Sequence, residues 1–200
     1  MKTVVFHGSP RKDGNSDTLA KSFVDGLRAN GNGEIKEFYA NDLCIKPCQM
    51  CESCSKPERV KLAPNNCVIR DDMEEIYPAF AEADVVVFAT PIIWGYMTAQ
   101  LKAILDRMEA IASNRYFGGK AFVVIITCWH HYQTLVAFFK RAIADYYDDV
   151  KLHTIIYCSL DPTSKKDVHV SNCKQKLEEA YNLGRNLGNP NFSAASQQEN

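Results

Sequence analysis

The stretch from Gly8 to Thr18 carries the residues whose types and spacing point most clearly to chemistry. It combines hydroxyl, amide and guanidinium donors with glycines that let the backbone close on a ligand. The donor side chains are those of Ser9, Arg11, Asn15, Ser16 and Thr18. Such a set of donors is typical of a phosphate-binding loop.

The sequence on both sides of this stretch supports that interpretation. The apolar run Thr3-Val4-Val5-Phe6 precedes it, and a helical stripe of Leu19, Phe23 and Leu27 follows it. The loop therefore leads into a helix N-terminus, where unpaired N–H groups attract anions. The alternative is a polar surface turn with an ordinary N-cap. Neither the nucleotide-triphosphate loop nor the dinucleotide fingerprint matches the spacing of Gly8 and Gly14.

The run Gly8-Ser9-Pro10-Arg11 followed by Gly14-Asn15-Ser16 resembles the phosphate loop of the flavodoxin-like NAD(P)H-dependent FMN reductases and their iron–sulfur flavoprotein relatives. The resemblance extends from Lys2 to Leu187 and implies that the loop holds the FMN 5′-phosphate. It implies an oxidoreductase in which NAD(P)H reduces bound FMN, which then reduces a small acceptor such as a flavin, a quinone or a nitro- or azo-aromatic. No side chain need act as an acid or base in that chemistry, so none is assigned as catalytic. A flavin-free redox-sensing module is the alternative from another class.

A second loop, Thr90 to Thr98, is unusually apolar for a connection between a strand and a helix. It presents Trp94, Tyr96 and Met97, and aromatic side chains at such a position can flank a flat ring. The resemblance implies that the isoalloxazine contacts are Pro91, Ile92, Ile93, Trp94 and Gly95. The alternative is that Trp94 and Tyr96 pack on the following helix or on a partner subunit. We expect Thr98 to cap that helix.

A third loop follows the next apolar run and reads Thr127-Cys128-Trp129-His130-His131-Tyr132. By the resemblance, Thr127, Cys128 and Trp129 lie beneath the ribityl chain and the flavin O2 edge. Their bulk departs from the small residues common in the family. His130 or His131 is able to stabilise negative charge on reduced flavin, but a histidine at a loop–helix junction more often caps or faces solvent.

Four cysteines, Cys48, Cys51, Cys54 and Cys67, form the second group able to do chemistry. Three at this spacing are able to bind one corner of a [4Fe–4S] cluster, which a fourth thiolate completes. The iron–sulfur flavoproteins resemble this segment, although their fourth cysteine follows the third closely. Three interpretations stay open: a cluster, a zinc ion, or no metal. With a cluster, a protein electron donor is implied. Cys158 and Cys173 fit apolar patterns and are expected in the core.

The composition bounds the remaining possibilities. Two hundred residues with 46% hydrophobic and 24% charged side chains suit one globular domain, expected over residues 1–188 with a cysteine-rich insertion at about 44–70. A net charge of −1 gives no reason to propose nucleic acid or an anionic membrane as a partner. No apolar run suits a membrane span or a signal peptide, so we expect a cytoplasmic protein. Residues 189–200 are expected to form a disordered tail.

Apolar runs alternate with helical patterns along the chain. The expected strands are Lys2–His7, Glu34–Tyr39, 84–90, 121–127 and Lys151–Cys158. The expected helices are 16–30, 71–83 (interrupted or kinked at Pro78), 98–111, 132–147 and 170–187. This alternation predicts an α/β fold with a five-stranded parallel sheet covered on both faces. The flavodoxin-like order 2-1-3-4-5 places the ligand at the carboxyl ends of the strands, in the loops after His7, Thr90 and Thr127.

The apolar loops also bear on assembly. Residues 94–97 and the pair Tyr116-Phe117 are more apolar than loops usually are. Together with the habit of the family, this predicts a homodimer or homotetramer in which a second copy covers the flavin edge.

Overall fold

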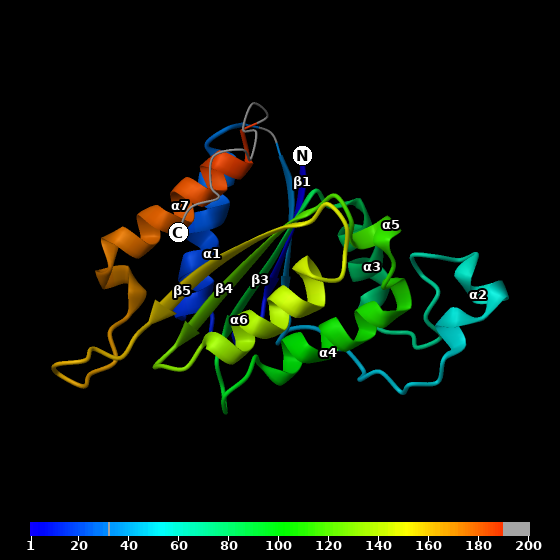
Figure 1. Ribbon diagram of the computed structural model, residues 1–200, viewed down its shortest axis with the longest axis horizontal. Helices are drawn as coiled ribbons and strands as arrows, with labels where there is room; N and C mark the ends of the chain where they lie inside the picture. The colour runs from blue at the N-terminus through cyan, green and yellow to red at the C-terminus, as the bar shows by residue number, and fades with distance from the viewer. Residues whose placement is uncertain (32, 190–200) are drawn as a thin grey trace.

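A parallel β-sheet forms the centre of the molecule (Figure 1). The computed structural model describes residues 1–31 and 33–189. Its strands are β1 (Lys2–His7), β2 (Glu34–Tyr39), β3 (Val85–Pro91), β4 (Ala121–Cys128) and β5 (Lys151–Cys158). All neighbours are parallel and the order is β2-β1-β3-β4-β5, which confirms the predicted flavodoxin-like topology. All of the predicted tail except Asn189 lies outside the described residues.

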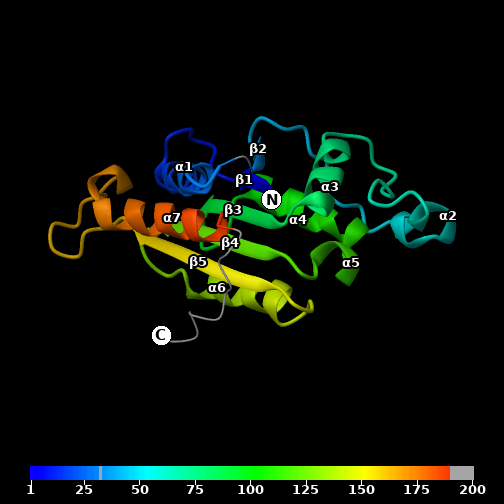
Figure 2. The ribbon, with the colours of Figure 1, turned by 90° about the horizontal axis from the view of Figure 1, so that it is seen from above.

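Two long helices, α1 (Asn15–Arg28) and α7 (Lys174–Leu187), cover one face of the sheet (Figure 2). The apolar stripe of α1 packs against the outward side chains of β1, β3 and β4, as the sequence pattern predicts. The two helices cross closely, since a Cβ added at Gly26 would lie 2.0 Å from the carbonyl oxygen of Tyr181. Glycine at this crossing lets the two backbones touch.

The opposite face is covered by α3 (Met73–Glu82), α4 (Ala99–Arg107) and α6 (Gln133–Phe139). Phenylalanines from both layers form a continuous aromatic core there, with Phe88 stacked on Phe122 and Phe139. The near-continuous apolar runs of β3 and β4 are therefore buried on both sides, as central parallel strands are.

The helices differ from the expected elements in several details. Helix α3 is not interrupted at Pro78, which lies within it. The expected helix 98–111 changes to a 3₁₀ turn at Met108–Ile111, and 132–147 changes to a π-helical turn at Lys140–Ala144. A separate 3₁₀ turn, Val170–Asn172, precedes α7. The short helices α2 (Pro57–Val60) and α5 (Asn114–Phe117) were not expected, since a single turn leaves no periodicity to detect.

The sheet determines where ligand-binding loops gather. Because all the strands run parallel, the carboxyl ends of β1, β3, β4 and β5 lie along one edge, and His7, Ala89 and Tyr39 share one register across it.

Among the helices of the described residues, none has both the length and the apolar character that a membrane span requires.

Candidate functional site

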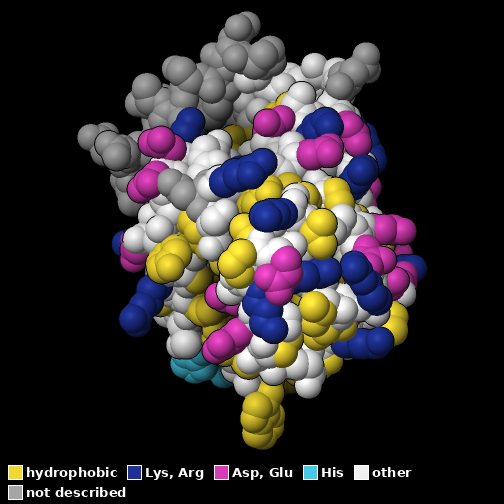
Figure 3. Space-filling model, turned by 90° about the vertical axis from the view of Figure 1, so that its right-hand side faces the viewer, with side chains coloured by type: hydrophobic (Ala, Val, Ile, Leu, Met, Phe, Trp, Pro, Cys, Tyr) yellow, Lys and Arg dark blue, Asp and Glu magenta, His cyan; other side chains and the backbone are white. Residues whose placement is uncertain are grey.

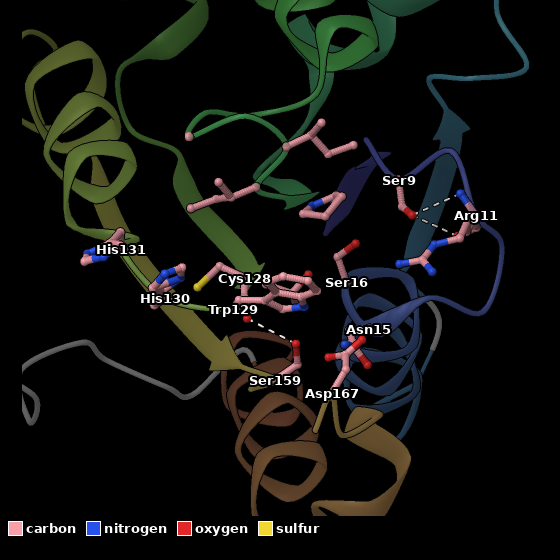
Figure 4. A pocket seen from close by; sticks show the side chains of 15 residues that line it. Ser9, Arg11, Asn15, Ser16, Cys128, Trp129, His130, His131, Ser159 and Asp167 are labelled. Atoms are coloured by element: carbon pink, nitrogen blue, oxygen red, sulfur yellow. Dashed lines mark hydrogen bonds between the residues drawn. The ribbon is translucent and has the colours of Figure 1, made fainter. Parts of the chain in front are cut away.

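A cavity of about 430 Å³ opens at the carboxyl edge of the sheet. The three loops expected there, after His7, Thr90 and Thr127, all line it, and the loop after β5 joins them (Figure 4). The lining residues are Ser9, Arg11, Asn15, Ser16, Pro91, Ile92, Ile93, Gly95, Thr127, Cys128, Trp129, His130, His131, Ser159 and Asp167. This volume is within the range of small-molecule and cofactor sites.

The β1–α1 loop supplies the polar end of the cavity. Helix α1 begins there after Gly14, and no side chain caps its free N–H groups. Ser16, almost fully buried, and the amide-bearing Asn15 lie at this helix start, with Arg11 across the loop (Figure 4). An uncapped helix start lined by a hydroxyl, an amide and a guanidinium is suited to an anion such as a phosphate.

Ser9 has a different part in this loop from the one expected. Its hydroxyl accepts a hydrogen bond from the Arg11 N–H at 3.1 Å and donates to the Arg11 carbonyl at 2.9 Å. Ser9 therefore closes the turn that presents Arg11, and it does so while lining the cavity.

A hydrogen-bond chain joins the β1–α1 loop to the β3–α4 loop. The N–H of Gly8 donates to the Ala89 carbonyl at 2.7 Å, and the Thr98 hydroxyl donates to the Gly8 carbonyl at 2.7 Å. Thr98 also caps α4 as predicted, accepting from the Leu101 N–H at 3.4 Å. A Cβ at Gly8 would lie 3.0 Å from the Ala89 oxygen, so glycine allows the close approach of the two loops.

The β3–α4 loop supplies the apolar wall. The backbone groups of Ile93 and Tyr96 pair with each other at 2.9 and 3.2 Å, and the two residues between them, Trp94 and Gly95, both have positive φ. This is the pattern of a tight type I′ turn. Pro91, Ile92 and Ile93 line the cavity, whereas Trp94 at the tip is fully exposed and does not.

The two other apolar residues of this loop face the protein interior. Tyr96 packs edge-on against Phe138 of α6, with ring centroids 5.6 Å apart, and Met97 is in the core. Tyr96 therefore packs on a helix, as one of the alternatives predicted, but that helix is α6 and not α4, which follows the loop.

The β4–α6 loop closes the cavity from the other side. Thr127 and Cys128 are buried, while Trp129 and the two histidines stand at the rim, with the rings of His130 and His131 4.3 Å apart. The Ser159 N–H donates to the Cys128 carbonyl at 2.7 Å, which joins the ends of β4 and β5.

Besides Trp94, three further placements differ from the residues expected at the site. Thr18 does not line the cavity, and its hydroxyl donates to the Asp13 carbonyl at 3.3 Å. Ser159 and Asp167 do line it, although the sequence did not single them out. The rule that ligands bind at the carboxyl ends of parallel strands identifies Ser159, because it directly follows the fifth strand. No sequence signal identifies Asp167, which an antiparallel bridge to Leu160 brings to the site.

The cysteine segment encloses a second cavity, of about 390 Å³, which shares no lining residue with the first. Its walls include all four cysteines considered as cluster ligands: Cys48, Cys51, Cys54 and Cys67. In both ribbon views the segment around α2 stands at the end of the molecule away from α7 (Figures 1 and 2). Within the residues described, no three His, Cys, Asp or Glu side chains are close enough together to hold a metal ion.

Polar contacts help to hold this segment in place. Asn66 donates to the carbonyls of Cys54 at 3.0 Å and Ala110 at 2.6 Å, and Arg59 donates to the Cys67 carbonyl at 2.6 Å. On its outer face, hydrophobic side chains are scattered among charges of both signs (Figure 3). Its exposed large hydrophobic residues are Met50, Val60, Leu62 and Val68.

A buried ion pair attaches the segment to the domain. The Arg107 guanidinium, 1% exposed, lies 2.6 Å from the Asp71 carboxylate and donates to the Lys46 carbonyl at 2.8 Å. Burial alone would raise the pKa of Asp71, but the hydrogen bonds from Arg107 and from the backbone N–H groups of Lys46 and Met73 together outweigh it and hold that pKa below its usual value.

The first cavity fits FMN on the chemistry of its walls. Anion donors gather at an uncapped helix start at one end, and Pro91, Ile92, Ile93 and Trp129 offer apolar surface at the other. A phosphorylated chain carrying a flat aromatic ring needs this pairing of ends.

Comparison with known proteins gives consistent results. The family described as NADPH-dependent FMN reductase matches residues 1–144. An iron-sulfur flavoprotein of Archaeoglobus fulgidus is 35% identical over 120 residues, 60% of this chain and 51% of that protein. One of Methanosarcina thermophila is 34% identical over 116 residues, 58% of this chain and 56% of that protein. The chain thus spans about half the length of the curated relatives it matches.

Solved structures share the fold at low sequence identity. The NAD(P)H:quinone oxidoreductase from Methanothermobacter marburgensis superposes with a TM-score of 0.62 at 18% identity, covering 94% of this chain and 98% of that one. An FMN-dependent NADH-azoreductase from Bacillus anthracis in complex with FMN gives a TM-score of 0.64 at 17% identity, covering 94% of this chain and 100% of that one.

Proposed function

This chain belongs to the NADPH-dependent FMN reductase family, and from that premise we propose that it is an FMN-dependent oxidoreductase. In this proposal it carries reducing equivalents from NAD(P)H to a small acceptor, such as a flavin, a quinone or a nitro- or azo-aromatic. The supporting observation is the cavity at the carboxyl edge of the sheet, which has anion donors at one end and apolar walls at the other. Bound FMN would accept a hydride and pass the electrons on.

The residues of the chain bind and orient the cofactor in this proposal. Ser16, Asn15 and Arg11, with the free N–H groups of α1, hold the 5′-phosphate. Pro91, Ile92 and Ile93 support one side of the isoalloxazine, while Thr127, Cys128 and Trp129 border the other. The Ile92 N–H donates to the Thr127 carbonyl at 2.8 Å, which joins the two walls. No acid or base is assigned to the hydride transfer.

The test is reconstitution followed by reduction. The full chain is incubated with FMN, freed of excess cofactor, and its absorption spectrum recorded before and after anaerobic addition of NADPH or NADH. We expect retained flavin bands that bleach with a nicotinamide and return when a quinone is added. Failure to retain FMN, or retained FMN that neither nicotinamide reduces, would contradict the proposal.

A second candidate function is that of an iron–sulfur flavoprotein that passes single electrons from a protein donor. Two observations favour it: the four cysteines line one cavity, and the relatives of Archaeoglobus and Methanosarcina are iron-sulfur flavoproteins. In this candidate the cysteine segment would have to close until Cys48, Cys51, Cys54 and Cys67, which are not close enough together in this structure, converge on a [4Fe–4S] cluster. Reconstitution with iron and sulfide, with Cys44→Ser as the matched control, should give about four irons per chain, and Cys54→Ser should abolish them. Iron uptake that is absent, or equal in Cys54→Ser, would exclude the cluster.

We also propose that a second copy of the chain covers the cavity mouth, giving a homodimer or homotetramer. Trp94 is fully exposed and Ile93 is 53% exposed, both on the loop that forms the apolar wall. Exposed apolar side chains at a ligand site are typical of surfaces that associate. Light scattering should show at least a dimer, and Trp94→Ser should shift the population toward monomer. A parent protein that is monomeric at micromolar concentration would contradict the proposal.

A further inference from the structure

Two thiols face each other at the carboxyl ends of β4 and β5, where the Sγ atoms of Cys128 and Cys158 are 3.6 Å apart. We propose that this pair is a redox-active dithiol in the wall of the cavity, closed to a disulfide by exchange with a low-molecular-weight disulfide. The proposal concerns residues outside the cysteine segment and needs neither a cluster nor bound FMN.

The sheet register brings the two residues together. Cys128 pairs with Cys158 as the last of eight matched positions between β4 and β5. Directly paired residues of parallel strands point to the same face, and strands lie about 4.8 Å apart. Disulfides need Cα atoms between about 4.4 and 6.8 Å apart, so the backbone spacing suits a bond. The sulfurs need only approach by side-chain rotation to about 2 Å.

The two thiols differ in access. Cys158 is exposed, whereas Cys128 is 7% exposed and lines the cavity with its neighbour Ser159. Burial, followed by the contact with Cys158, raises the pKa of Cys128 to about 12, so Cys128 stays a thiol near neutral pH. An incoming disulfide therefore meets Cys158 first, and Cys128 acts as the resolving thiol.

The exchange balances in two steps. The Cys158 thiolate attacks a small disulfide RSSR, forming a Cys158–SR mixed disulfide and releasing RS⁻, which takes up the proton that Cys158 lost. Cys128 then gives up its proton and attacks Cys158 Sγ, which forms the Cys128–Cys158 bond and releases the second RS⁻ as RSH. The net change is oxidation of two protein thiols and reduction of RSSR to two RSH.

Oxidation at this position changes the cavity wall. Cys128 Sγ lines the cavity, and the Ser159 N–H and hydroxyl both bond to the Cys128 carbonyl, at 2.7 and 3.2 Å. The backbone ends of both strands are therefore already fixed to each other, so closing the bond moves sulfur more than backbone. Cys128 and the thiols of the cysteine segment line different cavities, so the proposed pair is distinct from that segment.

The experiment is thiol mapping of the full chain in glutathione buffers. The protein is equilibrated at graded ratios of oxidised to reduced glutathione, quenched in acid, alkylated and digested. We expect the peptides containing Cys128 and Cys158 to become linked in the oxidising buffers and to separate again when reduced glutathione is restored. Cys173→Ser, a cysteine packed against the core elsewhere, is the matched control and should keep the link.

Two variants distinguish the order of events. Cys128→Ser should accumulate a glutathione adduct on Cys158, because the resolving thiol is gone. Cys158→Ser should leave Cys128 free to be alkylated after unfolding. Separate alkylation of both cysteines at every buffer ratio would overturn the proposal, as would linkage of either one to a cysteine of residues 44–67. Because no cofactor is added, a failure here is independent of whether FMN binds.

Discussion

His7 and Asp17 form a buried ion pair beneath the β1–α1 loop, with Nδ1 of His7 2.7 Å from Oδ1 of Asp17 and both side chains at most 1% exposed. The second carboxylate oxygen of Asp17 accepts from the Asp13 N–H at 2.7 Å, and Nε2 of His7 lies 3.1 Å from Glu37. The pair thus joins the end of β1 to the backbone of the loop that would hold phosphate.

The protonation of this pair follows from its surroundings. Burial by itself lowers the pKa of His7, but Asp17 and Glu37 outweigh it and raise that pKa above its ordinary value. Burial raises the pKa of Asp17, and the contacts with His7, the Asp13 N–H and Lys21 overcome it and lower that pKa to about 2. Both shifts favour the charged His7–Asp17 pair in the folded protein. Arg28 and Lys12 lie at the edge of the same group, on Glu37 and over Tyr39.

The first prediction is a pH-dependent loss of stability in His7→Gln. A histidine whose pKa is raised on folding stabilises the folded protein fully at pH values below its unfolded pKa of about 6.5. This stabilisation is lost as pH rises through the higher pKa of the folded protein. We expect His7→Gln to cost about 3 kcal/mol at pH 6, as removal of one partner of a buried pair does, and less as pH rises. Urea unfolding between pH 5.5 and 9 measures the difference between parent and variant.

His130→Gln serves as the control, since His130 is an exposed histidine. Its difference from the parent should stay near zero across the pH range. A His7→Gln difference that grows as pH rises would mean that His7 is neutral in the folded protein.

The second prediction concerns the contact between the two loops. Thr98→Val removes the hydroxyl that donates to the Gly8 carbonyl and caps α4, and leaves two buried backbone groups without that partner. We expect a loss of about 2 kcal/mol in the free energy of unfolding, and weaker FMN binding. Thr134→Val, on the exposed face of α6, should change stability by less than about 0.5 kcal/mol. Equal effects of the two substitutions on unfolding would show that the contact contributes nothing.

The third prediction tests the crossing of α1 and α7. A Cβ at Gly184 would lie 2.0 Å from the Phe23 carbonyl oxygen, so Gly184→Ala must push the helices apart. Helix propensity favours alanine by about 1 kcal/mol, but we expect the clash to prevail and to cost a net ~2 kcal/mol in chemical unfolding. The exposed Asn182→Ala in the same helix should be neutral or slightly stabilising. A Gly184→Ala protein as stable as the parent would contradict the packing.

Much of the fold follows from the sequence because buried parallel strands and amphipathic helices leave strong patterns. The runs in β3 and β4 and the stripe of α1 identify the sheet, its order and the edge where loops gather. The residues with least periodicity were the least predictable. Trp94 is an example, because the tight turn that presents it requires a positive φ. Tryptophan rarely adopts a positive φ, so the sequence gives no reason to predict that turn.

The candidate site was predictable where it follows directly from a strand. Arg11, Asn15 and Ser16 lie where the strand–loop–helix pattern placed them. Asp167 reaches the cavity from a segment distant in the sequence. The Ser9 hydroxyl bonds to the backbone of its own loop, and only the three-dimensional contacts reveal this. The apolar patterns predicted Cys158 and Cys173 as core residues, but Cys158 is exposed. Its contact with Cys128 depends on the register of β4 and β5, which the sequence does not show.

The central claim is that the start of α1 holds the phosphate of a flavin whose ring lies in the same cavity. The most direct test compares FMN with riboflavin, which lacks the phosphate, by titration calorimetry on the parent, Arg11→Gln and Ser16→Val. We expect FMN to bind the parent about 100-fold more tightly than riboflavin, and each substitution to weaken FMN about 10-fold while leaving riboflavin unchanged. Equal affinities for the two flavins, or substitutions that weaken both alike, would contradict the claim.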